Sequence, residues 1–237
     1  MIKKLALTAV LLGVALLTLT GCFGKSSRRF IEGKAAELSK VYPTENLEDL
    51  FEKFPEGFSI WSEDLYDYKE EGYLFQSVKL KGDIEAQKIT GTILWKKVTF
   101  DNDNKKHTEI LYEGGVIYKD GMIQLMDSQA NVMIRNPKLL LQEFTINKDI
   151  LSRLKMGGKG YSYETGSADI DYTITDPIVN NYMRVEQDKE LKMIFYIMSG
   201  TVENKAYSYT FEIKDGHNSH SELFSGYKEK KYKLYND

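Results

Sequence analysis

Histidines are the first residues to test for chemistry, because imidazole serves both as a base and as a metal ligand. The chain has three: His107, His217 and His220. His217 and His220 have the spacing of two ligands on one helical turn, but they follow Asp215-Gly216, a turn signal. No cysteine or clear carboxylate completes a ligand set near them. We therefore expect no metal site here.

Two acidic patterns are the next candidates. Asp101 to Asn104 begins like a calcium loop, but Lys106 and Tyr112 stand where that loop needs its glycine and its bidentate glutamate. Asp169 and Asp171 are spaced to share one face of a strand and could act as a general-acid pair, although exposed carboxylates on a sheet give the same pattern. Neither pattern predicts a catalytic site.

Nucleophiles and phosphate cradles are poorly represented. Gly157 to Gly160 is rich in glycine but lacks the Walker spacing, and no Gly-x-Ser-x-Gly elbow occurs. The only cysteine is Cys22, close to the N-terminus. The sequence therefore predicts a non-enzymatic protein without a cofactor.

Cys22 has a different chemistry, because it ends an export signal. Lys3 and Lys4 are followed by the apolar run Leu5 to Leu19 and by Leu19-Thr20-Gly21-Cys22, which fits the lipobox of bacterial lipoproteins. As a helix the run spans roughly 22 Å, short for a hydrocarbon core of about 30 Å. A plain secretory signal ends in an Ala-x-Ala-like site, which is absent. We predict Cys22 as the lipid attachment site.

This assignment sets the domain organisation. We expect residues 1–21 to be a lipoprotein signal peptide, residues 22–29 a lipidated tether, and residues 30–237 a single α+β lipoprotein domain. A thioether-linked diacylglycerol supplies two acyl chains, which anchor stably where one chain binds marginally. The predicted location is the extracellular face of the cell membrane.

Charge says little about further partners. The net charge of −3 gives no reason to expect nucleic acid. Lys25, Arg28 and Arg29, just after the anchor, either contact anionic headgroups or belong to a solvated tether. Both interpretations remain open from the sequence alone.

Helical patterns are few and short. In the clearest, Leu47, Leu50, Phe51 and Phe54 form one apolar stripe after Asn46, a good N-cap. The stripe predicts a core face; the alternative is a docking face for a partner. We expect helices over residues 30–41, 47–54, 137–144, 148–155 and 177–185.

Strand patterns dominate the remainder. Asp120-Gly121 predicts a tight hairpin turn, Gly91 a bulge or a bend, and residues 157–167 a glycine-rich loop. Consecutive strands joined by short turns are antiparallel, so we predict α+β architecture: an antiparallel sheet meander with a few helices packed on one face or at its ends. The expected strands are 58–61, 73–80, 84–100, 108–112, 116–118, 122–126, 170–174, 191–201 and 206–214, with a polar turn at 215–220 and a tail at 227–237.

Aromatic residues are abundant, with 16 tyrosines, 11 phenylalanines and 2 tryptophans. Aromatic side chains favour strands, so ordinary sheet packing explains them. The alternative is a contact surface for protein or glycan, because tyrosine gives a large contact area at low entropic cost. The residues concerned are Tyr161, Tyr163, Tyr172, Tyr207 and Tyr209.

The chain resembles a known family in several places. Tyr42-Pro43-Thr44-Glu45-Asn46-Leu47-Glu48-Asp49-Leu50-Phe51 is similar to a signature near the mature N-terminus of the staphylococcal tandem lipoproteins. Together with the lipobox, the later matches extend the resemblance over most of the chain. These matches are Asp171-Tyr172-Thr173-Ile174, Leu191-Lys192-Met193, Gly200, Tyr209 and Phe211.

The resemblance implies a surface-exposed, membrane-anchored α+β lipoprotein linked to host-cell contact, and it carries over one site residue, Cys22. We expect a non-enzymatic surface lipoprotein that contacts a host or envelope protein, with membrane lipid as a second partner through Cys22. One alternative is a ligand-binding lipoprotein of an uptake system. Another is an envelope hydrolase, which would need clustered Asp, His or Ser in one cleft.

Overall fold

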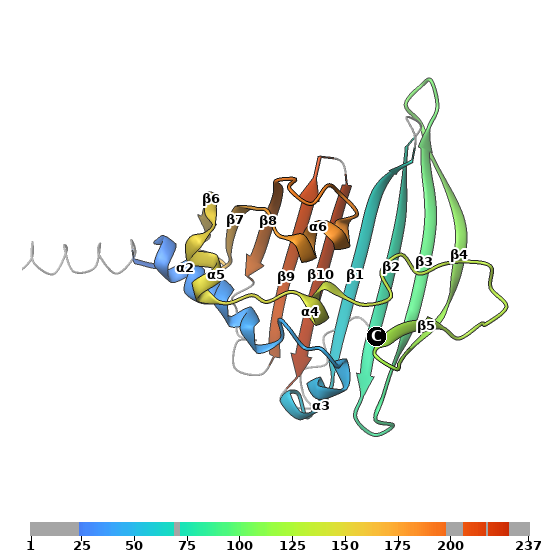
Figure 1. The fold of residues 1–237 in the computed structure, drawn as a ribbon, viewed down its shortest axis with the longest axis horizontal. Coiled ribbons are helices and arrows are strands. Elements are labelled where there is room, and N and C mark those ends of the chain that lie inside the picture. The colour runs from blue at the N-terminus through green and yellow to red at the C-terminus, as the bar shows by residue number, and fades with distance from the viewer. Residues whose placement is uncertain (1–23, 69–71, 198–205, 217, 228–237) are drawn as a thin grey trace, which may run out of the picture.

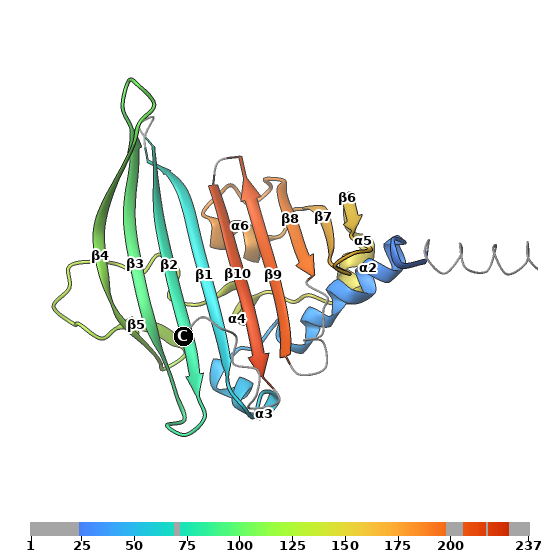
Figure 2. The same ribbon diagram turned by 180° about the vertical axis from the view of Figure 1, so that it is seen from behind.

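The computed structural model describes residues 24–68, 72–197, 206–216 and 218–227. These residues form one antiparallel sheet of ten strands, in the order β5-β4-β3-β2-β1-β10-β9-β8-β7-β6 (Figures 1 and 2). The strands are β1 (Phe58–Tyr68), β2 (Gly72–Asp83), β3 (Lys88–Phe100), β4 (Lys106–Lys119), β5 (Met122–Leu125), β6 (Lys155–Tyr161), β7 (Ala168–Ile174), β8 (Leu191–Ile197), β9 (Ala206–Asp215) and β10 (Asn218–Tyr227).

The sheet consists of two meanders. The first runs from β1 outward to β5, and the second runs from the opposite edge, β6, inward to β10. They join because the first strand pairs with the last, from Phe58 opposite Gly226 to Leu65 opposite Ser219. The segment between β5 and β6 crosses the sheet from one edge to the other (Figure 1). The predicted antiparallel sheet is confirmed, and its middle is the β1–β10 pair.

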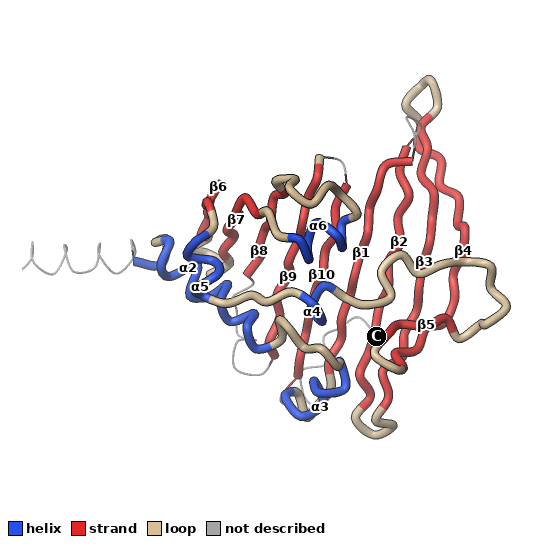
Figure 3. Tube along the Cα trace, in the orientation of Figure 1, coloured by secondary structure: helices blue, strands red, loops and turns tan. Residues whose placement is uncertain are grey.

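The helices are short and lie on one face of the sheet, which we call the covered face (Figure 3). The opposite face carries no helix among the described residues, and we call it the open face (Figure 2). The fold is thus mostly sheet with few helices. The helices are α2 (Arg28–Ala35), η1 (Ala36–Lys40), η2 (Leu47–Asp49), α3 (Leu50–Lys53), α4 (Leu140–Glu143), α5 (Lys148–Arg153) and α6 (Pro177–Met183), where η marks a 3-10 helix.

Alternation along the strands assigns the two faces. In β9, Tyr207, Tyr209, Phe211 and Ile213 are buried, whereas the residues between them are partly exposed. This period of two is expected for a strand with one covered face. Phe211 lies in the core, with ring centroids 5.2 Å from Phe195, 5.6 Å from Tyr42 and 6.2 Å from Phe144. The core is therefore the layer between the sheet and its helices.

The apolar stripe after Asn46 is confirmed as a core face. Leu47, Leu50 and Phe54 are buried. The Asn46 side chain accepts a hydrogen bond from the backbone N–H of Glu48 at 3.2 Å, which caps the segment. The single helix expected over 47–54 is a 3-10 turn followed by one α-helical turn, η2 and α3.

The helices expected after residue 136 form only in part. Pro137 does not begin a helix: its carbonyl accepts from the N–H of Ile123 at 2.7 Å, so it extends beside β5. The first helix, α4, therefore begins at Leu140. Asn147 caps α5 as predicted, accepting from the N–H of Ile150 at 2.9 Å. Asp176 caps α6 in the same way.

Two segments predicted as irregular are strands in part. Residues 157–161 of the predicted glycine-rich loop belong to β6, whereas residues 162–167 form the turn to β7. A Cβ at Gly158 or Gly160 would meet the carboxylates of Asp171 and Asp169 on β7. Glycine here lets the two strands pair beneath those carboxylates, which local turn propensity does not reveal. The polar turn expected at 215–220 instead ends at Asn218, where β10 begins. The predicted turn is therefore present at Gly216, which has a φ of 56°, but the prediction was wrong for residues 218–220.

Turns and bulges were predicted with mixed success. The Asp120-Gly121 hairpin is confirmed, with φ of 54° and 78° as a tight two-residue turn requires. Gly91 forms no bulge; a Cβ there would overlap the carbonyl of Lys79 on the neighbouring strand. The register shift lies instead at Trp95/Lys96.

Candidate functional site

The structure separates the predicted candidates. His107 lies on β4 in an exposed position, where its Nε2 is 3.1 Å from the Asp101 carboxylate in the β3–β4 turn. His220 lies on β10 and is completely buried. His217 and Cys22 lie outside the described residues. The two described histidines therefore belong to different environments and do not share a cleft.

Asp169 and Asp171 do share a face of β7, as predicted, and it is the open face. Asp171 forms an ion pair with Lys192 at 3.2 Å. Asp101 accepts backbone N–H groups from Asp103 and Lys105, both at 2.9 Å, so its carboxylate shapes a turn. Among the described residues, no group of three or more histidine, cysteine, aspartate or glutamate side chains could hold a metal ion.

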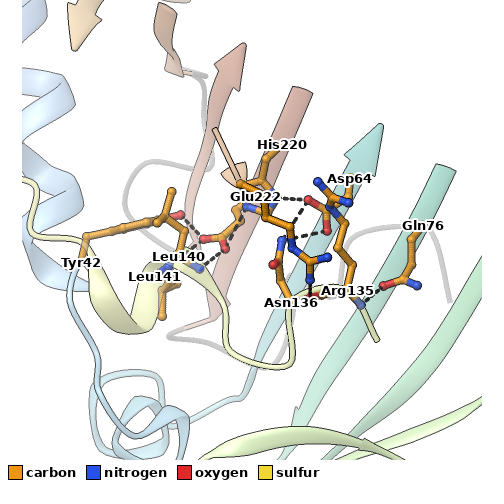
Figure 4. A network of polar contacts seen from close by, with 10 residues as sticks. Tyr42, Asp64, Gln76, Arg135, Asn136, Leu140, Leu141, His220 and Glu222 are labelled. Carbon is orange, nitrogen blue, oxygen red and sulfur yellow. Dashed lines mark hydrogen bonds and ion pairs between the residues drawn. The ribbon is translucent and has the colours of Figure 1, made fainter. Parts of the chain in front are cut away.

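The structure brings together a cluster that the sequence did not suggest. Asp64 on β1 and Glu222 on β10 flank His220 from both sides (Figure 4). The Nδ1 of His220 is 3.0 Å from Asp64, and its Nε2 is 3.2 Å from Glu222. All three residues are buried on the covered face of the sheet. We call this group the buried triad.

Glu222 receives hydrogen bonds from three further groups. The hydroxyl of Tyr42 donates to it at 2.6 Å, and the backbone N–H groups of Leu140 and Leu141 donate at 2.7 and 3.0 Å. The two N–H groups belong to the first turn of α4, which has no intrahelical acceptor for them. A fully buried carboxylate is thereby satisfied at both oxygens.

The segment between β5 and β6, which we call the β5–β6 connector, also contacts the Asp64 side of the triad and links it to β2. Asn136 donates from its side-chain amide to both oxygens of Asp64, at 3.2 and 3.3 Å. The next residue back, Arg135, donates its backbone N–H to Gln76 on β2 at 2.7 Å (Figure 4). Its guanidinium lies 4.0 Å from the ring centre of Tyr66. The β5–β6 connector is thus fixed to three neighbouring strands.

The two carboxylates determine the charge of His220. Burial alone lowers the pKa of His220, but the adjacent carboxylates of Asp64 and Glu222 outweigh it and raise the pKa to about 9. The ring of Tyr182 packs edge-on against the imidazole with centroids 4.7 Å apart. At neutral pH the triad therefore contains an imidazolium that donates both N–H groups to carboxylates.

This arrangement is unsuited to acid–base catalysis. A general base needs a free nitrogen within reach of the substrate, and both ring nitrogens of His220 are engaged. The imidazole is also fully buried, and Asp64, His220 and Glu222 do not line any of the three surface grooves found among the described residues. The triad instead connects Tyr42, the first strand, the last strand and the connector. We interpret it as a structural cluster that stabilises the pairing of β1 with β10 at the middle of the sheet.

The open face of the same two strands offers an accessible site. A groove of about 790 Å³ lies where β1, β2 and β10 run side by side. Trp61 is 39% exposed in it, and its indole N–H donates to the Ser77 hydroxyl at 2.7 Å. The Lys79 ammonium lies 4.2 Å from the Trp61 ring centre. The remaining open-face side chains of the groove include Ser59, Lys81, Thr92, Leu223, Ser225 and Tyr227.

The strand register extends this surface beyond the groove. Successive pairings place Trp61 opposite Leu223 and Lys79, Leu223 opposite Thr210, and Thr210 opposite Tyr196. Tyr196 is 40% exposed. We call this cross-strand line, from Tyr196 through Thr210, Leu223 and Trp61 to Lys79, the open-face row.

The tyrosines named in the sequence analysis fall into two groups, one explained by core packing and one exposed at the surface. Tyr172, Tyr207 and Tyr209 are buried on the covered face, so core packing explains them. Tyr163 is 54% exposed, and its ring lies 5.0 Å from that of Tyr161. The aromatic residues of the open-face row, Trp61 and Tyr196, were not among the predicted candidates.

Comparison with known proteins adds no family. No protein-family model and no curated protein matches the chain. A solved structure similar in part is the crystal structure of a monomeric dehydratase domain from a trans AT polyketide synthase split module. It has 9% identity, covers 72% of this chain and 82% of the other, and gives a TM-score of 0.19. A TM-score this low carries no argument about fold or activity.

No helix among the described residues is both long and apolar enough to cross a membrane.

Proposed function

We propose that the protein is a non-enzymatic surface lipoprotein, held to the cell membrane through Cys22 and contacting a host or envelope protein through the open face of its sheet. The anchor rests on the lipobox ending at Cys22 and on the resemblance to staphylococcal tandem lipoproteins. The observation that supports the contact is the open-face row, which displays Trp61 and Tyr196 on a sheet face that carries no helix of the described residues.

The composition of this surface suits a protein partner. Tryptophan and tyrosine are enriched among the residues that dominate binding energy at protein interfaces. Trp61 is held in place by Ser77 and stacked by Lys79, so little side-chain entropy remains to be lost when a partner binds. Thr210 and Ser59, which are partly exposed and carry hydroxyl groups, flank the apolar centre, as the polar rim of an interface does.

The anchor is tested by comparing wild type with Cys22→Ala in the native host. Membrane fractionation and mass spectrometry of the N-terminal peptide are the measurements. Wild type should carry a diacylglyceryl adduct and fractionate with membrane, while the variant should be uncleaved or shed. Equal behaviour of both proteins without any lipid would overturn the anchor.

The contact is tested with variants of the open face. A partner captured from envelope or host extracts should be purified and titrated against wild type, Trp61→Ala and Lys106→Ala. Saturable binding that weakens at least tenfold in Trp61→Ala alone supports the proposal, because Lys106 is an exposed residue distant from the open-face row. Equal binding by all three proteins would contradict it.

A second candidate function is small-ligand binding in an uptake system. One observation favours it: the groove beside Trp61 has a volume typical of small-molecule sites. Its floor is a sheet surface rather than an enclosed apolar cavity. A ligand that raises the melting temperature of wild type but not of Trp61→Ala would favour this alternative over a protein partner.

A further inference from the structure

One end of the sheet joins segments that are far apart in the sequence. Helices α2 and α5 lie beside strand β6, at the edge opposite β4 and β5 (Figures 1 and 3). The guanidinium of Arg28 donates to the carbonyl of Leu154 at 3.4 Å, and the Lys159 ammonium donates to the carbonyl of Ser26. The Phe30 ring packs edge-on against Tyr161 at 6.0 Å. The start of the domain is therefore fixed against the β6 edge.

Exposed basic side chains gather at this end, and we call them the basic end. The contact described for Lys159 is with a carbonyl oxygen, which leaves its charge in place. Two members come from the start of the chain and three from more than 120 positions later. They are Lys25, Arg29, Arg153, Lys155 and Lys159.

Acidic residues balance this charge only in part. Helices α2 and α5 and strand β6 together contain two of them, Glu32 and Asp149. On the neighbouring strand β7, the carboxylates of Asp169 and Asp171 also lie against β6, and Asp171 is paired with Lys192. Glu32 is buried and pairs with Arg28 at 2.7 Å. Asp149 directly follows Lys148, so the two exposed charges offset each other. The basic end is positively charged although the whole chain has a net charge of −3.

We propose that the basic end rests on the surface of an anionic phospholipid bilayer, so that the sheet stands on its β6 edge and neither of its faces lies against the lipid. This inference rests on the proposed anchor at Cys22. Gly24 is the first described residue, and a two-residue span reaches at most about 7 Å, so an acyl chain on Cys22 holds Gly24 close to the headgroups. Gly24 is folded against the start of α2, since its carbonyl accepts from the N–H of Ser27 at 3.3 Å.

The distances favour this orientation. Surface charges act over a Debye length of about 8 Å at physiological ionic strength, and a short tether keeps the basic end within that range. A lysine or arginine near an anionic leaflet strengthens association about fivefold. The edge formed by β4 and β5 is then farthest from the membrane (Figure 1). A partner can reach the open-face row without meeting the bilayer.

The test uses full-length, lipidated protein reconstituted in vesicles. Cys22 is the only cysteine and is blocked by lipid in this protein, so a fluorophore can be placed at Ser152→Cys beside the basic end or at Asp103→Cys in the β3–β4 turn. Quenching by a headgroup-labelled lipid is measured in phosphatidylcholine vesicles with and without 30% phosphatidylglycerol. We expect phosphatidylglycerol to increase quenching at position 152 at least threefold and to leave position 103 unchanged.

A matched pair of variants separates local charge from total charge. Arg153→Gln/Lys155→Gln/Lys159→Gln removes three of the five charges of the basic end and should remove most of the phosphatidylglycerol effect, whereas Lys105→Gln/Lys106→Gln/Lys119→Gln should leave it unchanged. Melting temperatures close to that of wild type show that both variants fold. If the protein floats with the vesicles but quenching at position 152 does not exceed that at position 103, the proposed orientation is overturned and the anchor is not. Equal effects of the two triple variants would lead to the same conclusion. Absence of flotation with either vesicle would overturn the anchor, and this inference with it.

Discussion

The two faces of the β1–β10 pair use the same two strands in opposite ways. On the covered face, Asp64, His220 and Glu222 form a charged cluster without access to solvent. On the open face, Leu223, the residue after Glu222, and Trp61, on the same strand as Asp64, present apolar surface to the outside. This reverses the usual assignment of charge to the surface and apolar groups to the core.

The difference between the two faces raises two questions: how the buried charges are tolerated, and why apolar side chains are exposed. Charges tolerate burial only when they are paired and hydrogen-bonded, and in the triad both ring nitrogens and both carboxylates have partners. Exposed apolar groups gain nothing from water, so an apolar patch that persists on a surface points to a contact. The comparison therefore separates a face with a structural charged cluster from the face that we propose for binding. The predictions below test it in order of expected effect.

Removing the charge of Glu222 should have the largest effect on stability. In Glu222→Gln the new amide would face the N–H groups of Leu140 and Leu141, and His220 would lose one carboxylate. Breaking a buried ion pair from one side costs about 3–5 kcal/mol. Urea unfolding measures this loss. Glu212→Gln on the open face of β9 is the control and should cost less than about 1 kcal/mol. Equal losses would contradict a structural role for the triad.

Stability should fall as the pH rises above neutrality. The folded-state pKa of His220 is about 9, above the unfolded value near 6.5, so the folded protein binds a proton that the unfolded chain releases first. The contribution is complete below pH 6.5 and is lost as the pH rises through about 9. The free energy of unfolding, measured from pH 6 to pH 10, should show this decline. In His220→Gln the decline over this window should be much smaller, and an unchanged profile would assign it to other groups.

Loss of one hydrogen bond to the triad should cost less than loss of its charge. Tyr42→Phe removes the hydroxyl that donates to Glu222 at 2.6 Å but keeps the ring packed on Phe211. A hydrogen bond to a charged group contributes about 1.5–3 kcal/mol. Thermal unfolding is the measurement. Tyr209→Phe, which loses a hydroxyl contact with the partly exposed Glu37, is the matched control and should lose less.

Substitutions on the open face should change stability least. Leu223→Ser lies on the same strand as Glu222 but faces the opposite side of the sheet. Because its side chain is partly exposed already, we expect a loss of about 1 kcal/mol or less. The same change should weaken partner binding, because Leu223 lies between Trp61 and Thr210 in the open-face row. A loss as large as that of Glu222→Gln would mean that this face is also structural.

Sequence patterns predicted the structure correctly for segments whose conformation is set by residues close to them in the sequence. The Asp120-Gly121 hairpin and the caps at Asn46 and Asn147 are set by side chains within a few positions, and all three formed as expected. Strand β10 and the glycine-rich β6 depend on pairing with distant strands. Their polar and glycine content favours turns locally, so sequence patterns alone predicted loops.

The buried triad could not be predicted for the same reason. Asp64 and His220 are 156 positions apart and meet only because the first strand pairs with the last. The alternation of His220, Glu222 and Phe224 was the one available signal, since it places two ionisable groups on the same face as a core phenylalanine. The open-face row likewise depends on register across five strands. The lipid anchor at Cys22 remains a prediction from sequence.

The most direct test of the proposed contact is photo-crosslinking from defined positions in intact cells. A photoreactive amino acid would replace Thr210 in the open-face row, Ile178 on α6, or Asp103 in the β3–β4 turn, each with an exposed or partly exposed side chain. The account predicts a discrete crosslinked protein from position 210, lost when Trp61→Ala is added, and no such product from positions 178 and 103. The same product from position 178, or none from position 210 while Cys22 anchors the protein, would contradict the open face as the contact surface.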